Sequence, residues 1–143
     1  MTDADRPTLV ELEADECWNL IAEADVGRVG FVTHDEPTIL PVNHVIDDGA
    51  IYFRTGFGAK LDLAQRLSGS RVAFEVDGVD AEARRGWSVL VRGTVEPVLD
   101  TVVAAHLDRL GHHVWADDLE RTSWVRIGVD ELTGRRIESP PPD

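Results

Sequence analysis

The chain has 143 residues, of which 27 are acidic and 14 are basic, so its formal net charge is −13. A surface of this charge repels phosphate backbones and anionic lipids, which disfavours general binding to nucleic acid or to a membrane. The single cysteine, Cys17, excludes an internal disulfide and a cysteine-rich metal site, and we expect it to be a small core residue.

One domain accounts for most of the chain. The length suits a single core of ordinary size, and 43% hydrophobic with 29% charged residues is a globular composition. We predict a single domain over residues 12–137, a flexible N-terminal tail over residues 1–11 and a C-terminal tail over residues 138–143. No apolar run approaches the ~20 residues that cross a bilayer and the N-terminus is acidic, so we predict a cytoplasmic protein.

The N-terminal half predicts one helix followed by three strands. Apolar residues at helical spacing from Cys17 to Ala24 indicate a short amphipathic helix. The period then changes to two, which predicts strands over residues 26–33, 38–46 and 50–55. The segment Asp47-Asp48-Gly49 is typical of a hairpin between the last two strands. Because Pro41 cannot donate to a ladder, we expect it at an edge or a bulge.

The C-terminal half mixes helices with strands. One helix of about three turns is predicted to end near Ser68-Gly69, and another is predicted to be capped by Asp100. The expected strands cover residues 72–76, 87–96 and 124–129, the last continued by residues 135–137 after a Thr133-Gly134 turn. About six strands and three helices without regular βαβ alternation favour a mainly β fold, a small antiparallel barrel.

The first candidate site follows the strand over residues 50–55. Arg54 and Thr55 end that strand before a glycine-containing turn, and Lys60 stands in the first turn of the next predicted helix. Two cations, a hydroxyl and free N–H groups at a helix N-terminus are suited to a phosphate. The alternative is that Arg54 and Lys60 are solvated surface charges. Lys60 is the only lysine beside thirteen arginines, which favours a special role for it.

A second candidate site begins the strand over residues 87–96. Trp87 can line an aromatic ring, and the hydroxyl of Ser88 can add a hydrogen bond. The alternative is that Trp87 is a core residue and that Arg92 forms a salt bridge on the outer face of the sheet.

Histidines form the third candidate group. His106, His112 and His113 lie near Asp108, Asp117 and Asp118, but their spacing matches no compact metal motif, so we predict a solvated helix end and no metal. His44 lies in a predicted strand, where it could face a ligand or be hydrogen-bonded within the protein.

Several segments together resemble the pyridoxamine 5′-phosphate oxidase-like flavin-binding proteins, and most of all their short branch related to nitroimidazole-resistance proteins. The order and spacing of the segments, over about Leu12 to Ile137, carry this resemblance. They are Val26-Gly27-Arg28-Val29-Gly30-Phe31-Val32, Leu40-Pro41-Val42-Asn43-His44-Val45, Ile51-Tyr52-Phe53-Arg54-Thr55-Gly56 with Lys60, and Val72-Ala73-Phe74-Glu75-Val76-Asp77 with Gly86-Trp87-Ser88-Val89.

The resemblance implies a six-stranded antiparallel split β-barrel that forms a homodimer and binds two FMN molecules between its protomers. It implies that Pro41, Val42 and Asn43 run along the isoalloxazine edge. By the same resemblance, Arg54, Thr55 and Lys60 hold the FMN phosphate, and Trp87 with Ser88 closes the pocket.

From this resemblance we expect an FMN-dependent oxidoreductase that transfers hydride or electrons between a reduced nicotinamide or similar donor and a small-molecule substrate. No side chain is marked as a catalytic acid or base. The chain lacks the basic, histidine-containing C-terminal segment of pyridoxamine-phosphate oxidases, which argues against oxidation of vitamin B6. The alternatives are a flavin- or haem-binding protein without turnover, and a deazaflavin-dependent reductase.

Overall fold

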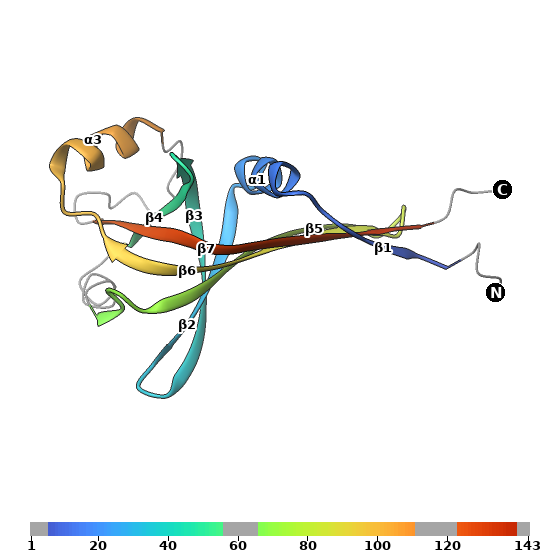
Figure 1. Cartoon of the computed structure of the whole chain (residues 1–143), viewed down its shortest axis with the longest axis horizontal. Coiled ribbons are helices and arrows are strands. Elements are labelled where there is room, and N and C mark those ends of the chain that lie inside the picture. Colours follow the sequence, from blue (N-terminus) through green and yellow to red (C-terminus); the bar gives the residue numbers. More distant parts are fainter. Residues whose placement is uncertain (1–5, 56–65, 111–122, 140–143) are drawn as a thin grey trace.

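The computed structural model describes residues 6–55, 66–110 and 123–139, and these are mainly β (Figure 1). Within them lie seven strands and two helices. In chain order they are β1 (Thr8–Glu11), α1 (Ala14–Glu23), β2 (Val26–Thr33), β3 (Glu36–Asp47), β4 (Ala50–Thr55), β5 (Arg71–Asp80), β6 (Arg85–Pro97), α3 (Thr101–Leu110) and β7 (Ser123–Glu138). The helix predicted before Ser68 falls mostly outside the described residues.

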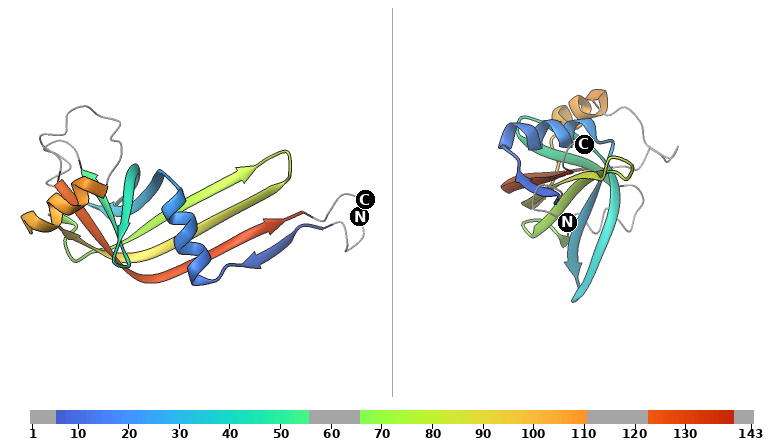
Figure 2. Two further views of the ribbon diagram at one scale, coloured as in Figure 1. Left: turned by 90° about the horizontal axis from the view of Figure 1, so that it is seen from above. Right: turned by 90° about the vertical axis from the view of Figure 1, so that its right-hand side faces the viewer.

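Six strands close into a ring, as the sequence predicts. The hydrogen-bonded order runs β7, β4, β3, β2, β5, β6, and β6 pairs again with β7. Every pairing in this ring is antiparallel. The prediction of a six-stranded antiparallel barrel is therefore confirmed. Figure 2 shows β5, β6 and β7 as long curved strands that continue well beyond the rest of the barrel.

The N-terminal tail prediction does not hold for its last residues. Thr8–Glu11 form β1, which pairs antiparallel with the end of β7 from Thr8 opposite Glu138 to Glu11 opposite Arg135. The sequence here has no period-two pattern because β1 is exposed along most of its length. Backbone hydrogen bonds to β7, and not a buried face, define this strand.

The predicted turn at Thr133-Gly134 is also wrong. Both residues continue β7, with Thr133 opposite Leu90 and Gly134 opposite Val89 of β6. A Cβ on Gly134 would stand only 2.5 Å from the sulfur of Cys17 on α1. This glycine therefore permits a close approach of α1 to the strand, where the sequence alone suggested a chain reversal.

Two-residue turns close both hairpins around β3. His34 and Asp35 join β2 to β3, and Asp48 and Gly49 join β3 to β4. All four residues have positive φ, from 47° to 72°, as type I′ turns require. The hairpin predicted at residues 47–49 is therefore present, and its turn sets the register of β3 against β4.

Pro41 lies where β3 has one neighbour. Residues of β3 before His44 pair only with β2, because the ladder with β4 covers His44 to Asp47. The side of Pro41 that lacks an N–H donor therefore faces no strand, which agrees with the expected edge position.

Two apolar clusters hold the two helices against the barrel. The larger fills the barrel with Phe74 at its centre, and α1 contributes the fully buried Cys17 and Ile21 to it. The smaller lies between α3 and the outer face of β4 and β7, where Leu107 and Trp124 are buried. Neither helix of the described residues is long and apolar enough to cross a membrane.

Candidate functional site

The structure brings two of the predicted site residues, Asn43 and Arg54, together where β3 and β4 lie side by side. The ladder between these strands reaches His44 opposite Phe53. Asn43 and Arg54 are the next residue on each strand, and alternation places both on the face of the barrel wall opposite to Phe53. The amide nitrogen of Asn43 donates to the carbonyl oxygen of Asp25 at 3.2 Å. Asn43 and Arg54 therefore share the outer face.

Pro41 and Val42, the other two residues expected along the isoalloxazine edge, face in opposite directions. Val42 packs against the core inside the barrel, whereas Pro41 is exposed. The backbone of Thr55 pairs with Ser123 of β7. The side chain of Thr55 and the whole of Lys60 lie outside the described residues.

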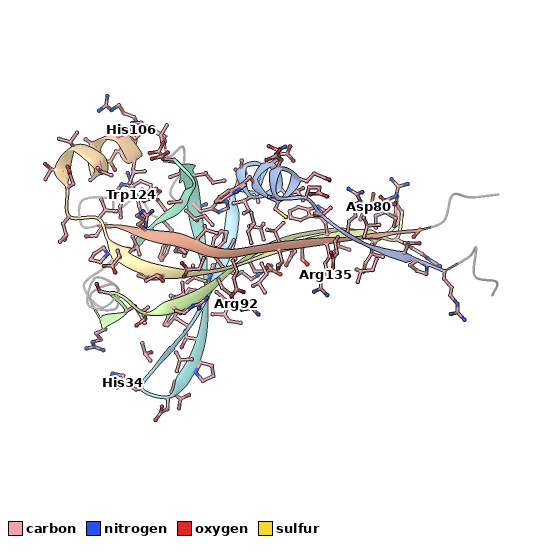
Figure 3. The ribbon with its side chains drawn as sticks, in the orientation of Figure 1. His34, Asp80, Arg92, His106, Trp124 and Arg135 are labelled. Carbon is pink, nitrogen blue, oxygen red and sulfur yellow. The ribbon has the colours of Figure 1, made fainter. Side chains whose placement is uncertain are left out.

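Arg54 lies between Asp108 of α3 and Trp124 of β7, and Trp124 is labelled in Figure 3. Its Nη2 donates to the carboxylate of Asp108 on α3, and its guanidinium carbon lies 4.6 Å from the ring centre of Trp124. The indole Nε1 of Trp124 donates to the same Asp108 oxygen at 2.8 Å. A carboxylate and an aromatic face therefore hold the guanidinium in place. Only 15% of the Arg54 side chain is exposed.

One donor of Arg54 has no partner within the described part of the chain. Its Nε is buried and makes no hydrogen bond there. A buried N–H of a guanidinium that lacks an acceptor is costly, and an anionic oxygen is the acceptor that suits it best. The chemistry of Arg54 therefore fits an anionic group such as a phosphate.

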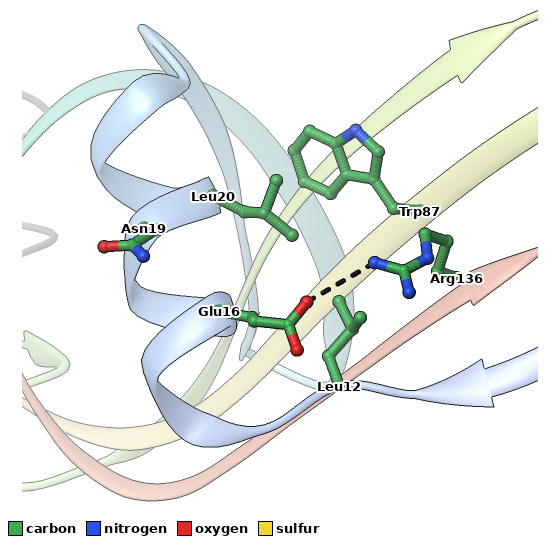
Figure 4. A pocket seen from close by; sticks show the side chains of 6 residues that line it. All are labelled: Leu12, Glu16, Asn19, Leu20, Trp87 and Arg136. Carbon is green, nitrogen blue, oxygen red and sulfur yellow. Dashed lines mark hydrogen bonds and ion pairs between the residues drawn. The ribbon is translucent and has the colours of Figure 1, made fainter.

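Trp87 points to a different place. Its indole packs against the barrel core and lies over Gly78 of β5, where a Cβ would stand 2.6 Å from its Nε1. Its other side borders a pocket of about 190 Å³ between α1 and β6 (Figure 4). The remaining residues that line this pocket are Leu12, Glu16, Asn19, Leu20 and Arg136. Arg136 bonds to Glu16 at 3.3 Å across it.

Arg54 and Trp87 do not line one pocket of a single chain. Arg54 pairs with Trp124 near the start of β7, and Trp87 pairs with Arg136 near its end. The stretch of β7 between these two neighbours measures about 40 Å at roughly 3.3 Å per residue. The two side chains also lie on opposite faces of the barrel wall, because Trp87 packs on the inner core and Arg54 lies under α3.

Ser88 faces outward, one residue after Trp87. It lies between Asp77 of β5 and Arg135 of β7. Asp77 accepts a hydrogen bond from Arg28 at 2.7 Å, and Arg28 pairs across β2 and β3 with Pro41. The outer face therefore connects Pro41 to Ser88 through the Arg28–Asp77 ion pair.

Glu75 extends this ion-pair network. It also accepts from Arg28, at 3.0 Å. Partial burial and the neighbouring Asp77 raise the pKa of Glu75, although Arg28 opposes the rise. Farther along the same face, Arg92 forms an ion pair with Glu131 at 3.2 Å, as one of the two sequence interpretations expected.

His44 is a buried histidine of the core. Its Nε2 lies 2.7 Å from the carbonyl oxygen of Ile21, so this nitrogen carries the proton and donates. Its ring meets Phe74 edge to face at 5.1 Å. Burial lowers the pKa of His44. Of the two possibilities left open by the sequence, the structure shows the hydrogen-bonded one.

The third candidate group is only partly described. His106 lies on α3 with its Nε2 3.4 Å from a carboxylate oxygen of Asp47, and half of its side chain is exposed. His112, His113, Asp117 and Asp118 lie outside the described residues. Within residues 6–55, 66–110 and 123–139, no three histidine, cysteine or acidic side chains are grouped to hold a metal ion.

Sequence reasoning missed the two residues that define the surroundings of Arg54. Asp108 was considered only with the histidines, and Trp124 only as the start of a strand. Trp124 could have been found by pairing the predicted strands, because it is directly opposite Arg54. Nothing in the sequence indicates the contact of Asp108 with Arg54, since it depends on how α3 packs on the barrel.

The closed ring of six antiparallel strands, with α1 against its core, defines a split-barrel protein. The family model described as pyridoxamine 5′-phosphate oxidase matches residues 13–136. The chain belongs to this family.

Three relatives are similar over nearly the whole chain. The Mycobacterium tuberculosis protein Rv0080 is 40% identical over 132 residues, which cover 90% of this chain and 86% of that protein. A Corynebacterium glutamicum structure, provisionally assigned as a pyridoxamine 5′-phosphate oxidase, is 36% identical with a TM-score of 0.79, covering 92% of this chain and 99% of that one. The FAD binding protein from Mycobacterium smegmatis is 35% identical with a TM-score of 0.74, covering 89% and 98%.

Proposed function

We propose that this protein binds a flavin, specifically FMN, and uses it as an oxidoreductase. The observation that carries the proposal is the buried Nε of Arg54, which has no partner among the described residues and lies on the face that also carries Asn43. It is supported by the similarity to the FAD binding protein from Mycobacterium smegmatis. A bound flavin would supply hydride or electron transfer between a reduced nicotinamide or similar donor and a small-molecule substrate.

The chain's own residues would bind and orient the cofactor. Arg54 would donate to the phosphate, together with Thr55 and Lys60, which the family resemblance assigns to the same group. Pro41 and Asn43 lie on the same outer face and would border the ring system. Because the side chain of Val42 is in the core, its contribution would come from its backbone.

We also propose that two copies complete the site. Trp87 and Arg54 point to opposite faces of one chain, so the indole that closes over a flavin held by Arg54 would come from a second copy. An interface on the β2–β3 hairpin is supported by two exposed apolar residues, Val32 and Ile39, which are 61% and 69% accessible. They border a hollow of about 640 Å³ between β3 and β5.

The first experiment identifies the cofactor. The purified protein is expected to show flavin absorbance, and mass analysis of the released ligand is expected to give FMN; FAD, a deazaflavin or a haem Soret band would contradict the FMN assignment. Bleaching of the flavin by a reduced nicotinamide supports an enzyme, and a bound flavin that no donor reduces contradicts it. Light scattering tests the dimer, and a monomer that holds a full complement of flavin would contradict the shared site.

Substitutions test the phosphate assignment. Lys60→Ala should weaken FMN binding by about 1.5–3 kcal/mol if the lysine makes a charge-assisted contact. Arg54→Gln should weaken FMN more than riboflavin, which lacks the phosphate. Arg84→Gln removes an exposed cation in the turn between β5 and β6 and serves as the control. Unaltered FMN affinity in both Lys60→Ala and Arg54→Gln would overturn the assignment.

A further inference from the structure

Asp108 occupies an unusual position for an acidic residue near an anion site. One of its carboxylate oxygens accepts from both Arg54 Nη2 and Trp124 Nε1. The Asp108 side chain is 57% exposed, whereas that of Arg54 is 15% exposed. The carboxylate is therefore more open to solvent than the guanidinium that it contacts.

This contact changes what Arg54 offers to a ligand. Its positive charge is compensated by Asp108, so the pair has no net charge, although the buried Nε has no acceptor among the described residues. A phosphate dianion must share the guanidinium with the carboxylate and is repelled by it. Two anions that share one guanidinium stand about 6 Å apart. At an effective dielectric constant near 40, each unit of negative charge on the phosphate is then repelled by Asp108 enough to weaken the binding of FMN about tenfold.

We infer that Asp108 is a specificity-determining residue that limits how strongly the site prefers phosphorylated over unphosphorylated flavin. It acts through Arg54, as a positioning residue on α3 that also opposes the incoming charge. The inference rests on the proposed flavin site. It requires that the phosphate contribute less to flavin affinity in the native protein than an uncompensated arginine would allow.

The test compares two ligands in matched variants. FMN and riboflavin are titrated into flavin-free wild-type protein and into Asp108→Asn by fluorescence quenching, because an amide oxygen can still accept both hydrogen bonds but carries no charge. The ratio of the riboflavin to the FMN dissociation constant should rise about a hundredfold in Asp108→Asn, about tenfold for each of the two charges on the phosphate.

Asp35→Asn is the control for net charge. Asp35 lies beside His34 at the tip of the hairpin far from Trp124 (Figure 3), and its positive φ suits asparagine. This variant should leave the ratio unchanged.

The outcomes separate the inference from the proposed function. If wild-type protein binds neither flavin, the proposed function fails and the inference fails with it. If wild-type protein binds FMN but Asp108→Asn shifts both flavins equally, or shifts neither, then Asp108 only fastens α3 and the inference alone is overturned. Thermal unfolding of both variants, which should remain cooperative, shows that the comparison is made on folded protein.

Discussion

His44 should make the stability of this protein fall in mild acid. His44 is only 9% exposed, its Nε2 donates to the carbonyl oxygen of Ile21 near the end of α1, and Phe74 meets its ring edge to face. The other ring nitrogen, Nδ1, is buried without a partner in the described part of the chain. A proton added there would place a charge in the core with no acceptor for the new N–H.

The sign of the effect follows from the lowered pKa. Burial lowers the pKa of His44 below its usual 6.5, and the Ile21 carbonyl and the charge of Asp25 only partly oppose this. Below pH 6.5 the unfolded chain therefore binds a proton that the folded protein refuses. The stabilisation is fully present above pH 6.5 and is lost as the pH falls towards the lowered pKa, at up to about 1.4 kcal/mol per pH unit.

The assay is urea unfolding between pH 7.5 and pH 5 for wild type and His44→Gln. Glutamine keeps an amide donor for the Ile21 carbonyl but does not titrate. The four other histidines titrate in both proteins, so the difference between the two pH profiles isolates His44. We expect the wild-type profile to fall more steeply below pH 6.5. Parallel profiles would refute the conclusion that His44 is held neutral.

Two further predictions concern packing and the Arg54 surroundings. Gly27→Ala should destabilise the protein by about 1–3 kcal/mol, because the new Cβ would lie 2.3 Å from Phe74, whereas Gly30→Ala on the same strand meets nothing nearer than 3.8 Å; equal urea midpoints for the two variants would contradict this. Trp124→Phe should lower the free energy of unfolding by about 1.5–3 kcal/mol, because the hydrogen bond to Asp108 is lost. In a double-mutant cycle with Asp108→Ala the two losses should not add; additive losses would contradict the coupling between these residues.

The predicted site residues that the structure brings together are those joined by local chain geometry. Asn43 and Arg54 flank one hairpin, and the two-residue turn at Asp48 and Gly49 fixes their register. The location of Trp87 depends instead on the pairing of β6 with β7 and on the packing of α1. Those contacts join residues far apart in the chain, so the spacing of residues in the sequence could not show that Trp87 and Arg54 lie in different places.

Period-two patterns and turn residues determined most strands, the hairpins beside β3 and the antiparallel class of the fold, because backbone geometry and side-chain alternation are local properties. Tertiary structure alone decided the rest. It made Gly134 a point of contact with Cys17, added β1 through backbone pairing, and brought Asp108 onto Arg54. A net charge of −13 gives no indication that one carboxylate lies against one guanidinium, because that contact exists only once α3 has packed on the barrel.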